Sequence, residues 1–360
     1  MRPRGPWRSF AEAALWRWWS GEGGWAGRAL SAAALPAELL FRGAVTIRAV
    51  AYASGVMGSR GAPLPVISVG NLTVGGTGKT PLVGWIVEAL RGWGGNPAVA
   101  LRGYGRDEAL LLRRWQPSTP VYSHRCREQA AREAAAAGAD VLVLDDGFQH
   151  RRLARELDMV LLAAEQAFPG ALLPRGPYRE PAGALRRAGL VMITRKIASA
   201  AAADALEAAV CRIAPGVGVV RARLTPARWE DLDGRPVPTP TGAVLAVTAI
   251  AGPRTFAALV GRETAAPVEV MAFPDHHEYT AADLQRVRQA AGARGVVVTE
   301  KDAVKLRAHA PTLPEVRVLA LDVEIEAGAE LLLRRLREAA GCGPSRPSGR
   351  RVDRRREGIS

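Results

Sequence analysis

Short apolar runs alternate along the chain with stretches in which apolar residues recur at helical spacing. The apolar runs lie at 66–69, 97–101, 140–144, 159–163, 190–193, 243–250, 268–272, 296–299 and 316–323. Helical spacing is found at 82–90, 125–137, 281–293, and from 253 and 327 onward. Strands that alternate with helices predict an α/β protein with a largely parallel sheet flanked by helices.

A long apolar stretch at 29–57 precedes this alternation and is interrupted by Pro36, Glu38, Arg42 and Arg48. A membrane-spanning helix needs about 20 nearly uncharged residues, so the stretch does not favour a transmembrane helix. On a helical wheel its three charged residues fall within roughly a third of the circle, and the remaining surface is apolar. The pattern suits a helix lying in a membrane interface, and it equally suits an amphipathic helix packed on its own domain.

Composition changes divide the chain into five predicted parts, with a turn-rich segment at 236–242 (PVPTPTG) between two lobes. The parts are a Trp- and Arg-rich N-terminal extension (1–28), a membrane-associated helix (29–58), a nucleotide-binding core lobe (59–235), a second, smaller α/β lobe (236–341) and a basic tail predicted to be disordered (342–360).

The chain is 360 residues long, with 48% hydrophobic residues and a net charge of +14. This composition excludes wholesale disorder, and the charge suggests nucleic acid, an anionic membrane or a phosphorylated substrate as partner. Much of the positive charge lies near the two ends, without a nucleic-acid reader motif, so we expect no nucleic-acid partner. The three cysteines form no C-x-x-C pair, which indicates a reducing cytosol rather than a disulfide framework.

The strongest chemical signal is a glycine-rich turn between the apolar run at 66–69 and the helical stretch at 82–90. Glycine-rich backbone amides, a helix N-terminus, a lysine and a threonine together cradle the phosphates of a nucleotide and its Mg²⁺. The strict pattern G-x-x-x-x-G-K-[ST] requires glycine where this chain has Thr73. The residues predicted to bind the nucleotide are Thr73, Val74, Gly75, Gly76, Thr77, Gly78, Lys79 and Thr80.

Two adjacent acids, Asp145 and Asp146, end the apolar run at 140–144. Nucleotide-binding proteins of this type use an acid at a strand end to hold Mg²⁺ beside the phosphates. Carboxylates are costly to bury unless they are paired or bound to metal, which disfavours a packing role. The predicted metal ligands are therefore Asp145, Asp146 and the Thr80 hydroxyl.

Further polar clusters lie at 102–106, 169–181, 273–279 and 299–305. The cluster at 273–279 places His276 and His277 beside carboxylates. Adjacent side chains on an extended segment diverge and H-x-x-x-H spacing is absent, so a proton-handling histidine is favoured over a metal site.

Six segments in this order give the sequence a specific resemblance to a known family. They are GNLTVGGTGKTP (70–81), LRGYGR (101–106), DDGFQHRRLARELD (145–158), LLPRGPYREP (172–181), FPDHHEYT (273–280) and TEKDAVKL (299–306). Over roughly 35–340 the chain resembles the lipid A disaccharide kinases, the tetraacyldisaccharide 4'-kinases. Thr73, which departs from the general loop pattern, fits the form of the loop in this family.

The resemblance implies a two-lobed P-loop kinase attached to the cytoplasmic face of the inner membrane by its N-terminal helix. Such an enzyme transfers the γ-phosphate of ATP to the 4'-hydroxyl of a tetraacyldisaccharide 1-phosphate, giving lipid IVA. Its cofactors are ATP and Mg²⁺, and its partners are the lipid A disaccharide 1-phosphate precursor and the membrane surface. We expect a monomer.

The resemblance also implies roles for individual residues. Lys79 matches the phosphate-binding lysine, Asp107 the catalytic base and His276 the histidine paired with that base. Residues that match the substrate site are Arg125, Arg179 and Glu180. One departure is a shortened connection before the base, whose G-D-E-P motif reads RDEA at 106–109. Either Asp107 reaches the sugar hydroxyl through a tighter turn, which we favour, or another residue is the base.

Two other classes of protein are alternatives to a lipid kinase. A GTPase-type switch requires a base-recognition motif such as N-K-x-D, which we do not find in the second half. A nucleic-acid-associated ATPase is suggested by the net charge alone.

Overall fold

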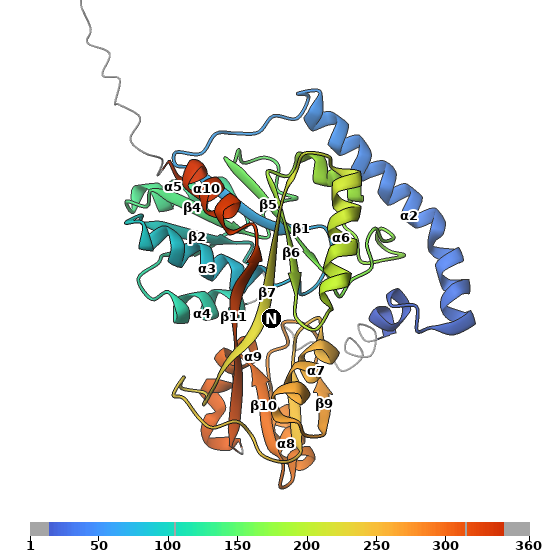
Figure 1. Cartoon of the computed structure of the whole chain (residues 1–360), viewed down its shortest axis with the longest axis vertical. Helices are drawn as coiled ribbons and strands as arrows, with labels where there is room; N and C mark the ends of the chain where they lie inside the picture. Colours follow the sequence, from blue (N-terminus) through green and yellow to red (C-terminus); the bar gives the residue numbers. More distant parts are fainter. Residues whose placement is uncertain (1–13, 104–105, 314, 342–360) are drawn as a thin grey trace, which may run out of the picture.

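The computed structural model describes residues 14–103, 106–313 and 315–341 (Figure 1). The predicted basic tail at 342–360 lies outside the described residues. The strands are β1 (Val66–Asn71), β2 (Pro97–Leu101), β3 (Val121–Ser123), β4 (Val141–Asp145), β5 (Leu157–Ala163), β6 (Leu190–Arg195), β7 (Gly218–Glu230), β8 (Val244–Thr248), β9 (Val268–Ala272), β10 (Gly295–Thr299) and β11 (Val316–Ala327).

Helices connect these strands, as the alternating pattern predicts. They are α2 (Gly24–Ala53), α3 (Lys79–Gly92), α4 (Arg106–Trp115), α5 (Arg127–Ala136), α6 (Ala200–Ile213), α7 (Pro253–Thr264), α8 (Ala281–Ala291), α9 (Glu300–Leu306) and α10 (Ala329–Ala340), with short 3₁₀ helices at Ala182–Arg187 and Arg307–Thr312.

All eleven strands belong to one sheet, ordered β3-β2-β4-β1-β5-β6-β7-β11-β10-β8-β9, and every pairing except β7 with β11 is parallel. Strand β1 lies between β4 and β5, and all six of its residues are buried. Its side chains alternate between two cores, because successive strand residues face opposite sides of a sheet. Ile67 packs with α3 and α10, whereas Val66 packs with α5. The predicted α/β fold with a mostly parallel sheet is confirmed.

Strands β7 and β11 form a long antiparallel pair that runs from the larger, upper part of the molecule to the smaller, lower part (Figure 1). Their register pairs Glu230 with Val318 at one end and Arg221 with Ala327 at the other. Helix α10 then returns to the first half, where Leu332 and Leu336 join the core beneath α3. The division into lobes at residue 236 stays a prediction.

Helix α2 lies along the outside of the first half (Figure 1). Of its residues, all of them described, only Glu38 is buried. Large apolar side chains on the same helix are exposed, namely Trp25, Leu30, Leu35, Leu39, Leu40, Ile47 and Val50. By length and composition alone, α2 could cross a membrane. The predicted N-terminal apolar helix is therefore present, and it begins at Gly24 rather than at residue 29.

Candidate functional site

The glycine-rich turn connects β1 to α3 and shapes the start of that helix. Gly78 caps α3 with φ +87°, a left-handed conformation that favours glycine. A Cβ added there would lie 2.5 Å from Leu224 Cδ1, so a side chain would also require Leu224 to shift. The first turn of α3, fully described, carries no acidic residue and no side-chain cap. Its amides are therefore available to bind an anion.

Neighbouring polar side chains hold the loop in place. Asn71 Nδ2 donates to Thr77 Oγ1 at 3.1 Å, and Thr194 Oγ1 donates to the Thr77 carbonyl at 2.9 Å. Thr73 Oγ1 donates to Gln166 Oε1 at 3.0 Å. The residue that breaks the general loop pattern is thus a buried anchor of the loop. A loop fixed in this way loses little further freedom when a ligand binds.

The middle of the loop is tied from two more directions. The amide of Val74 donates to the Pro177 carbonyl at 2.8 Å, which joins the loop to the proline-rich segment at 169–181. Lys196 Nζ, from the end of β6, donates to the Gly76 carbonyl at 3.0 Å. Lys196 is a cation that the sequence reasoning missed, and its position directly after an apolar run was the available signal.

Asp146 accepts charge-assisted contacts from two predicted site residues. The Arg179 guanidinium donates to both of its carboxylate oxygens, at 2.8 and 2.9 Å, and Lys79 Nζ lies 3.5 Å from Oδ1. Burial alone would raise the pKa of Asp146, but Lys79 and Arg179 outweigh burial and hold that pKa well below its usual range. Asp146 is therefore ionised and already paired.

Asp145 has a different environment at the end of β4. Burial, the largest cause, and the negative charge of Glu108 raise the pKa of its carboxyl to about 7, against the opposing charge of Lys79. Thr80 Oγ1 lies 3.4 Å from Asp145 Oδ2, whereas buried Oδ1 has no hydrogen-bond partner among the described residues. A buried carboxylate oxygen that lacks a partner is typical of a cation ligand.

These donors fit Mg²⁺, which prefers hard oxygen ligands and is held by one or two carboxylates together with waters and phosphate oxygens. Within residues 14–103, 106–313 and 315–341, no three His, Cys, Asp or Glu side chains form a metal-binding group by themselves. The Thr80 hydroxyl and Asp145 would hold the ion beside the phosphates, where it neutralises their charge. Asp146 is bound by Arg179, so it has less capacity left for metal.

Asp107 lies in the first turn of α4 and is almost fully buried. His276 Nδ1 lies 2.9 Å from its Oδ1 and 3.1 Å from its Oδ2. The short connection at 106–109 therefore still brings Asp107 to the histidine that the sequence reasoning favoured. His276 has φ +60°, an unusual value for a non-glycine residue.

Helix α9 places two lysines four residues apart on the face that packs against α4. Lys301 Nζ lies 3.7 Å from Asp107, 3.3 Å from Glu108 and 3.6 Å from Asp275. The Lys305 side chain is 2% exposed, and its Nζ lies 3.7 Å from Asp107 Oδ2. The acid comes from the first half of the chain and its positive partners from the second.

These partners control the charge of the pair. Burial would raise the pKa of Asp107, but the hydrogen bond with His276 and the charges of Lys301, His276 and Lys305 bring it well below its usual range. Burial would lower the pKa of His276, yet the hydrogen bond to Asp107 raises it overall. Asp107 is therefore ionised, and His276 favours its protonated form more than a free histidine does.

His277 faces away from this cluster. Its Nε2 lies 2.9 Å from Asp283 Oδ2, and its ring stacks on Phe273 with centroids 5.0 Å apart. Asp283 and Thr280 form the capping box at the start of α8. His277 thus supports a helix terminus, and of the two adjacent histidines His276 is the one in the acid cluster.

A cavity of about 330 Å³ opens beside Asp146. Cationic side chains dominate its lining, which consists of Arg48, Arg102, Arg125, Arg127, Asp146, Gln149, His150 and Arg179. Arg125 and Arg179, both predicted substrate residues, are brought together here. Arg48, Arg102 and Arg127 were not predicted as substrate residues; Arg48 and Arg102 come from segments distant in the chain, whereas Arg127 lies two residues from Arg125. A concave site with several arginines suits a phosphate group.

Glu180, the third predicted substrate residue, does not line this cavity. Its carboxylate accepts a hydrogen bond at 2.9 Å from Arg187, whose guanidinium lies 3.6 Å from the centroid of the Phe148 ring. Glu180 is buried and paired with Arg187, whereas the neighbouring Arg179 lines the cavity.

Comparison with known proteins gives consistent results over most of the chain. The model of a family described as LpxK, Tetraacyldisaccharide-1-P 4'-kinase, matches residues 30–108 and 105–340. A Tetraacyldisaccharide 4'-kinase of Anaeromyxobacter sp. (strain K) is 39% identical over 376 residues, which cover 92% of this chain and 97% of that protein. One from Halorhodospira halophila (strain DSM 244 / SL1) is 37% identical over 330 residues, covering 86% and 93%.

A solved structure supports the fold. The "apo" form of LpxK from Aquifex aeolicus, in complex with ATP, superposes with a TM-score of 0.68 at 24% sequence identity. The match covers 86% of this chain and 99% of that chain. At this identity the likeness establishes a shared fold.

Proposed function

The chain belongs to the tetraacyldisaccharide 4'-kinase family and is an ATP-binding kinase of lipid A biosynthesis, and from this premise we propose how its own residues carry out the reaction. The reaction moves the γ-phosphate of ATP to the 4'-hydroxyl of a tetraacyldisaccharide 1-phosphate and gives lipid IVA. The observation that carries the proposal is the meeting of Asp107 with His276, in a cluster whose Glu108 and Lys301 also act on the charge of Asp145.

Residues 73–80 hold the triphosphate in this proposal. The amides at the start of α3 and the Lys79 ammonium bind the β- and γ-phosphates, which requires no chemistry beyond positioning and charge neutralisation. Thr80 and Asp145 hold Mg²⁺, supported by the unpartnered Oδ1 of Asp145. Asp146 fixes Lys79 and Arg179 by ion pairs and is the second predicted acid at the metal.

Asp107 is the base in this scheme. The oxygen of the acceptor hydroxyl attacks the γ-phosphorus, the bond from phosphorus to the β–γ bridging oxygen breaks, and the hydroxyl proton passes to Asp107. A carboxylate with a lowered pKa is a weak base. His276 supports the transfer by holding the carboxylate in place with a hydrogen bond of 2.9 Å. Lys301 and Lys305 keep the surrounding charge balanced.

The arginine-lined cavity is where we place the acceptor's own phosphate. Arg125 and Arg179 line it together with three further arginines, and guanidinium groups match phosphate oxygens in geometry. Glu180 acts through Arg187 rather than by touching the acceptor. This arrangement puts the acceptor between the cavity and Asp107.

Helix α2 brings the enzyme to its lipid in this proposal. Its exposed apolar face lies in the cytoplasmic leaflet of the inner membrane, while buried Glu38 fastens the helix to the protein. Glu38 accepts a hydrogen bond from the Leu172 amide at 3.0 Å and pairs with Arg175 and Arg42. The polar side of α2 therefore faces the protein and its apolar side faces outward, as an interfacial helix requires. We expect the enzyme to act as a monomer.

The test is to incubate the full chain, in detergent, with labelled ATP, Mg²⁺ and tetraacyldisaccharide 1-phosphate. We expect transfer of label to the lipid, its loss in Lys79→Ala, and a raised KM for the lipid with little change in the KM for ATP in Arg125→Ala. Absence of label in the lipid would reject the proposal. ATP hydrolysis stimulated by DNA, with strong salt dependence, would favour a nucleic-acid-associated ATPase instead.

A further inference from the structure

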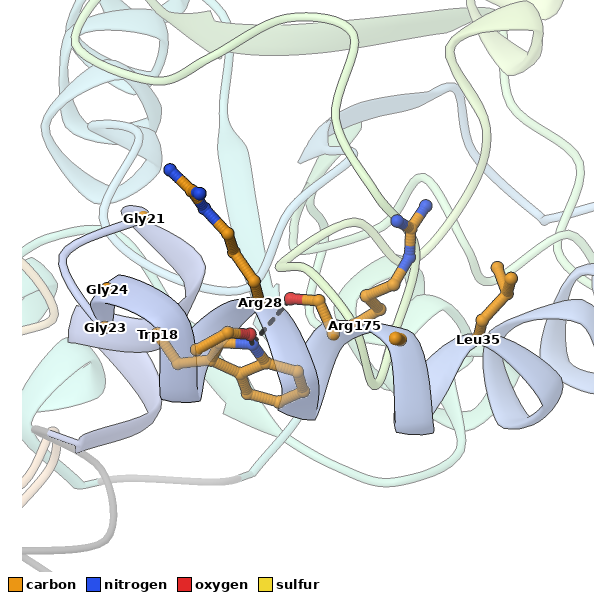
Figure 2. A pocket seen from close by; sticks show the side chains of 10 residues that line it. Trp18, Gly21, Gly23, Gly24, Arg28, Leu35 and Arg175 are labelled. Atoms are coloured by element: carbon orange, nitrogen blue, oxygen red, sulfur yellow. Dashed lines mark hydrogen bonds between the residues drawn. The ribbon is translucent and has the colours of Figure 1, made fainter.

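The structure packs a segment ahead of the matched family region against the glycine-rich loop. Residues 14–23 form a helical turn followed by a reversal, here called the tryptophan hairpin. Trp18 Nε1 donates to the Gly27 carbonyl at 3.0 Å and to Ser31 Oγ at 2.8 Å, which fixes the hairpin against the beginning of α2. Figure 2 shows the Trp18 indole lying along α2, with Gly21 and Gly23 at the reversal.

On its other side the hairpin touches the loop. A Cβ added to Gly75 would lie 2.9 Å from Cζ2 of Trp16 and 3.2 Å from Cβ of Ala251. The Trp16 ring and Ala251, which precedes α7, therefore both lie where a side chain of residue 75 would be. Gly75 has φ +103°, so both its conformation and its surroundings exclude a side chain.

Two more contacts hold the tryptophan hairpin, one with the proline-rich segment at 169–181 and one with α7. Trp19 Nε1 donates to the Pro174 carbonyl at 3.0 Å, in the segment that also binds the loop. Glu22 pairs with Arg254 of α7 at 2.5 Å. The dark-blue start of the described chain lies beside α7 in Figure 1. The hairpin thus connects α2, the glycine-rich loop, the proline-rich segment and the second half.

We propose that Trp16 is a positioning residue for the bound triphosphate, and that the tryptophan hairpin holds the glycine-rich loop against the second half of the chain. The proposal rests on ATP binding at residues 73–80. Without the Trp16 ring, Gly75 and the exposed Gly76 would have backbone freedom to lose when ATP binds. An indole packed on Gly75 limits that freedom beforehand and strengthens binding.

The test compares tryptophans of the same N-terminal region in the full chain, with ATP affinity measured by calorimetry in detergent. Trp16→Ala should raise the Kd for ATP about tenfold, the equivalent of leaving one backbone residue to be ordered on binding. Trp16→Phe, which keeps a ring on Gly75, should retain most of the affinity. Trp25→Ala is the matched control, because Trp25 is 84% exposed, and it should bind ATP like the wild type.

Two readouts separate positioning from a general loss of structure. The melting temperature without ATP and the KM for the lipid should stay the same in Trp16→Ala, because the hairpin lies outside the cores of the sheet. Charge reversal offers an independent check: Glu22→Arg and Arg254→Glu should each weaken ATP binding, and the double variant should restore it.

A Kd for Trp16→Ala equal to that of the wild type, or an equal loss in Trp25→Ala, would overturn the inference while leaving the kinase assignment intact. Failure of the wild-type protein to bind ATP would instead reject the proposed function.

Discussion

Asp107 and Asp145 are both buried carboxylates of the same site, and their surroundings shift their pKa values in opposite directions. Asp107 receives a hydrogen bond from His276 and lies within 3.7 Å of two lysine ammonium groups. Lys79 and Lys301 lower the pKa of Asp145, but burial together with the negative charges of Glu108 and Asp146 outweighs them. Burial raises the pKa of both carboxyls, so the difference comes from the neighbours.

The comparison shows which of the two carboxylates has enough positive charge around it and which does not. The protein itself supplies the positive charge around Asp107, from the second half of the chain. Around Asp145 that charge is incomplete, and a cation arriving with the nucleotide would complete it. One acid is therefore prepared before substrate binds, and the other becomes fully ionised only when its cation is present. This contrast can be tested in three ways, from the largest expected effect to the smallest.

The largest effect is expected from Asp107→Asn. The amide keeps the size of the side chain but cannot take the proton of the acceptor hydroxyl, so kcat should fall by about 10²–10⁴, the usual range for loss of a general base. The Kd for ATP should stay close to that of the wild type, because Asp107 does not touch residues 73–80. Single-turnover transfer to lipid and calorimetry with ATP measure the two quantities.

The partner histidine gives the control for this prediction. If Asp107 and His276 act as one unit, the double variant Asp107→Asn/His276→Ala should lose little more activity than Asp107→Asn alone. Fully multiplicative losses would show that the residues act separately. A near-normal turnover in Asp107→Asn would remove Asp107 from the role of base.

The second test concerns the pH dependence of Mg²⁺ binding. Since the pKa of Asp145 is about 7 in the folded chain, the carboxyl holds a proton that the unfolded chain loses near pH 4. Without metal, this group therefore makes the protein less stable as the pH rises from about 4 to 7. Mg²⁺ competes with that proton, so its affinity should rise about tenfold between pH 6 and pH 8.

Calorimetric titration with Mg²⁺ at the two pH values measures this effect, and thermal unfolding should show a larger stabilisation by Mg²⁺ at pH 8. Asp145→Asn is the matched control, because an amide has no proton to lose. If the Mg²⁺ affinity of the wild type did not depend on pH, the claim that Asp145 becomes ionised only with its cation would be wrong.

Much of the fold could be predicted because its elements are locally encoded. Strand β2 and strand β9 have the predicted bounds, since each is a short apolar run between turns. Strand β7 was missed because arginines alternate along it and Pro226 interrupts it. It pairs with β11 across the two halves, with an irregular register beside Pro226. That pairing is a tertiary contact, which no local pattern indicates.

The glycine-rich turn could be recognised because its residues, 73–80, are adjacent in the chain, and that they bind the nucleotide stays a prediction. The site was not predictable where side chains converge from distant segments. Lys305 is an ordinary basic residue in the sequence, and only the packing of α9 on α4 brings it to Asp107. Likewise, Glu38 interrupts an apolar helix in the sequence, and only its contacts with Leu172 and Arg175 show that it attaches the helix to the protein.

The smallest of the three effects is expected at His277, which adjoins His276 but turns away from Asp107. His277→Ala removes the hydrogen bond to Asp283, whose pKa remains lowered by its bonds with Thr280 despite opposing burial. The loss of one such bond should reduce the free energy of unfolding by about 1 kcal/mol, with kcat unchanged. Thermal unfolding and the transfer assay measure both. A fall in kcat as large as that of His276→Ala would mean that both histidines act on Asp107. The assignment of His277 to the start of α8 alone would then be wrong.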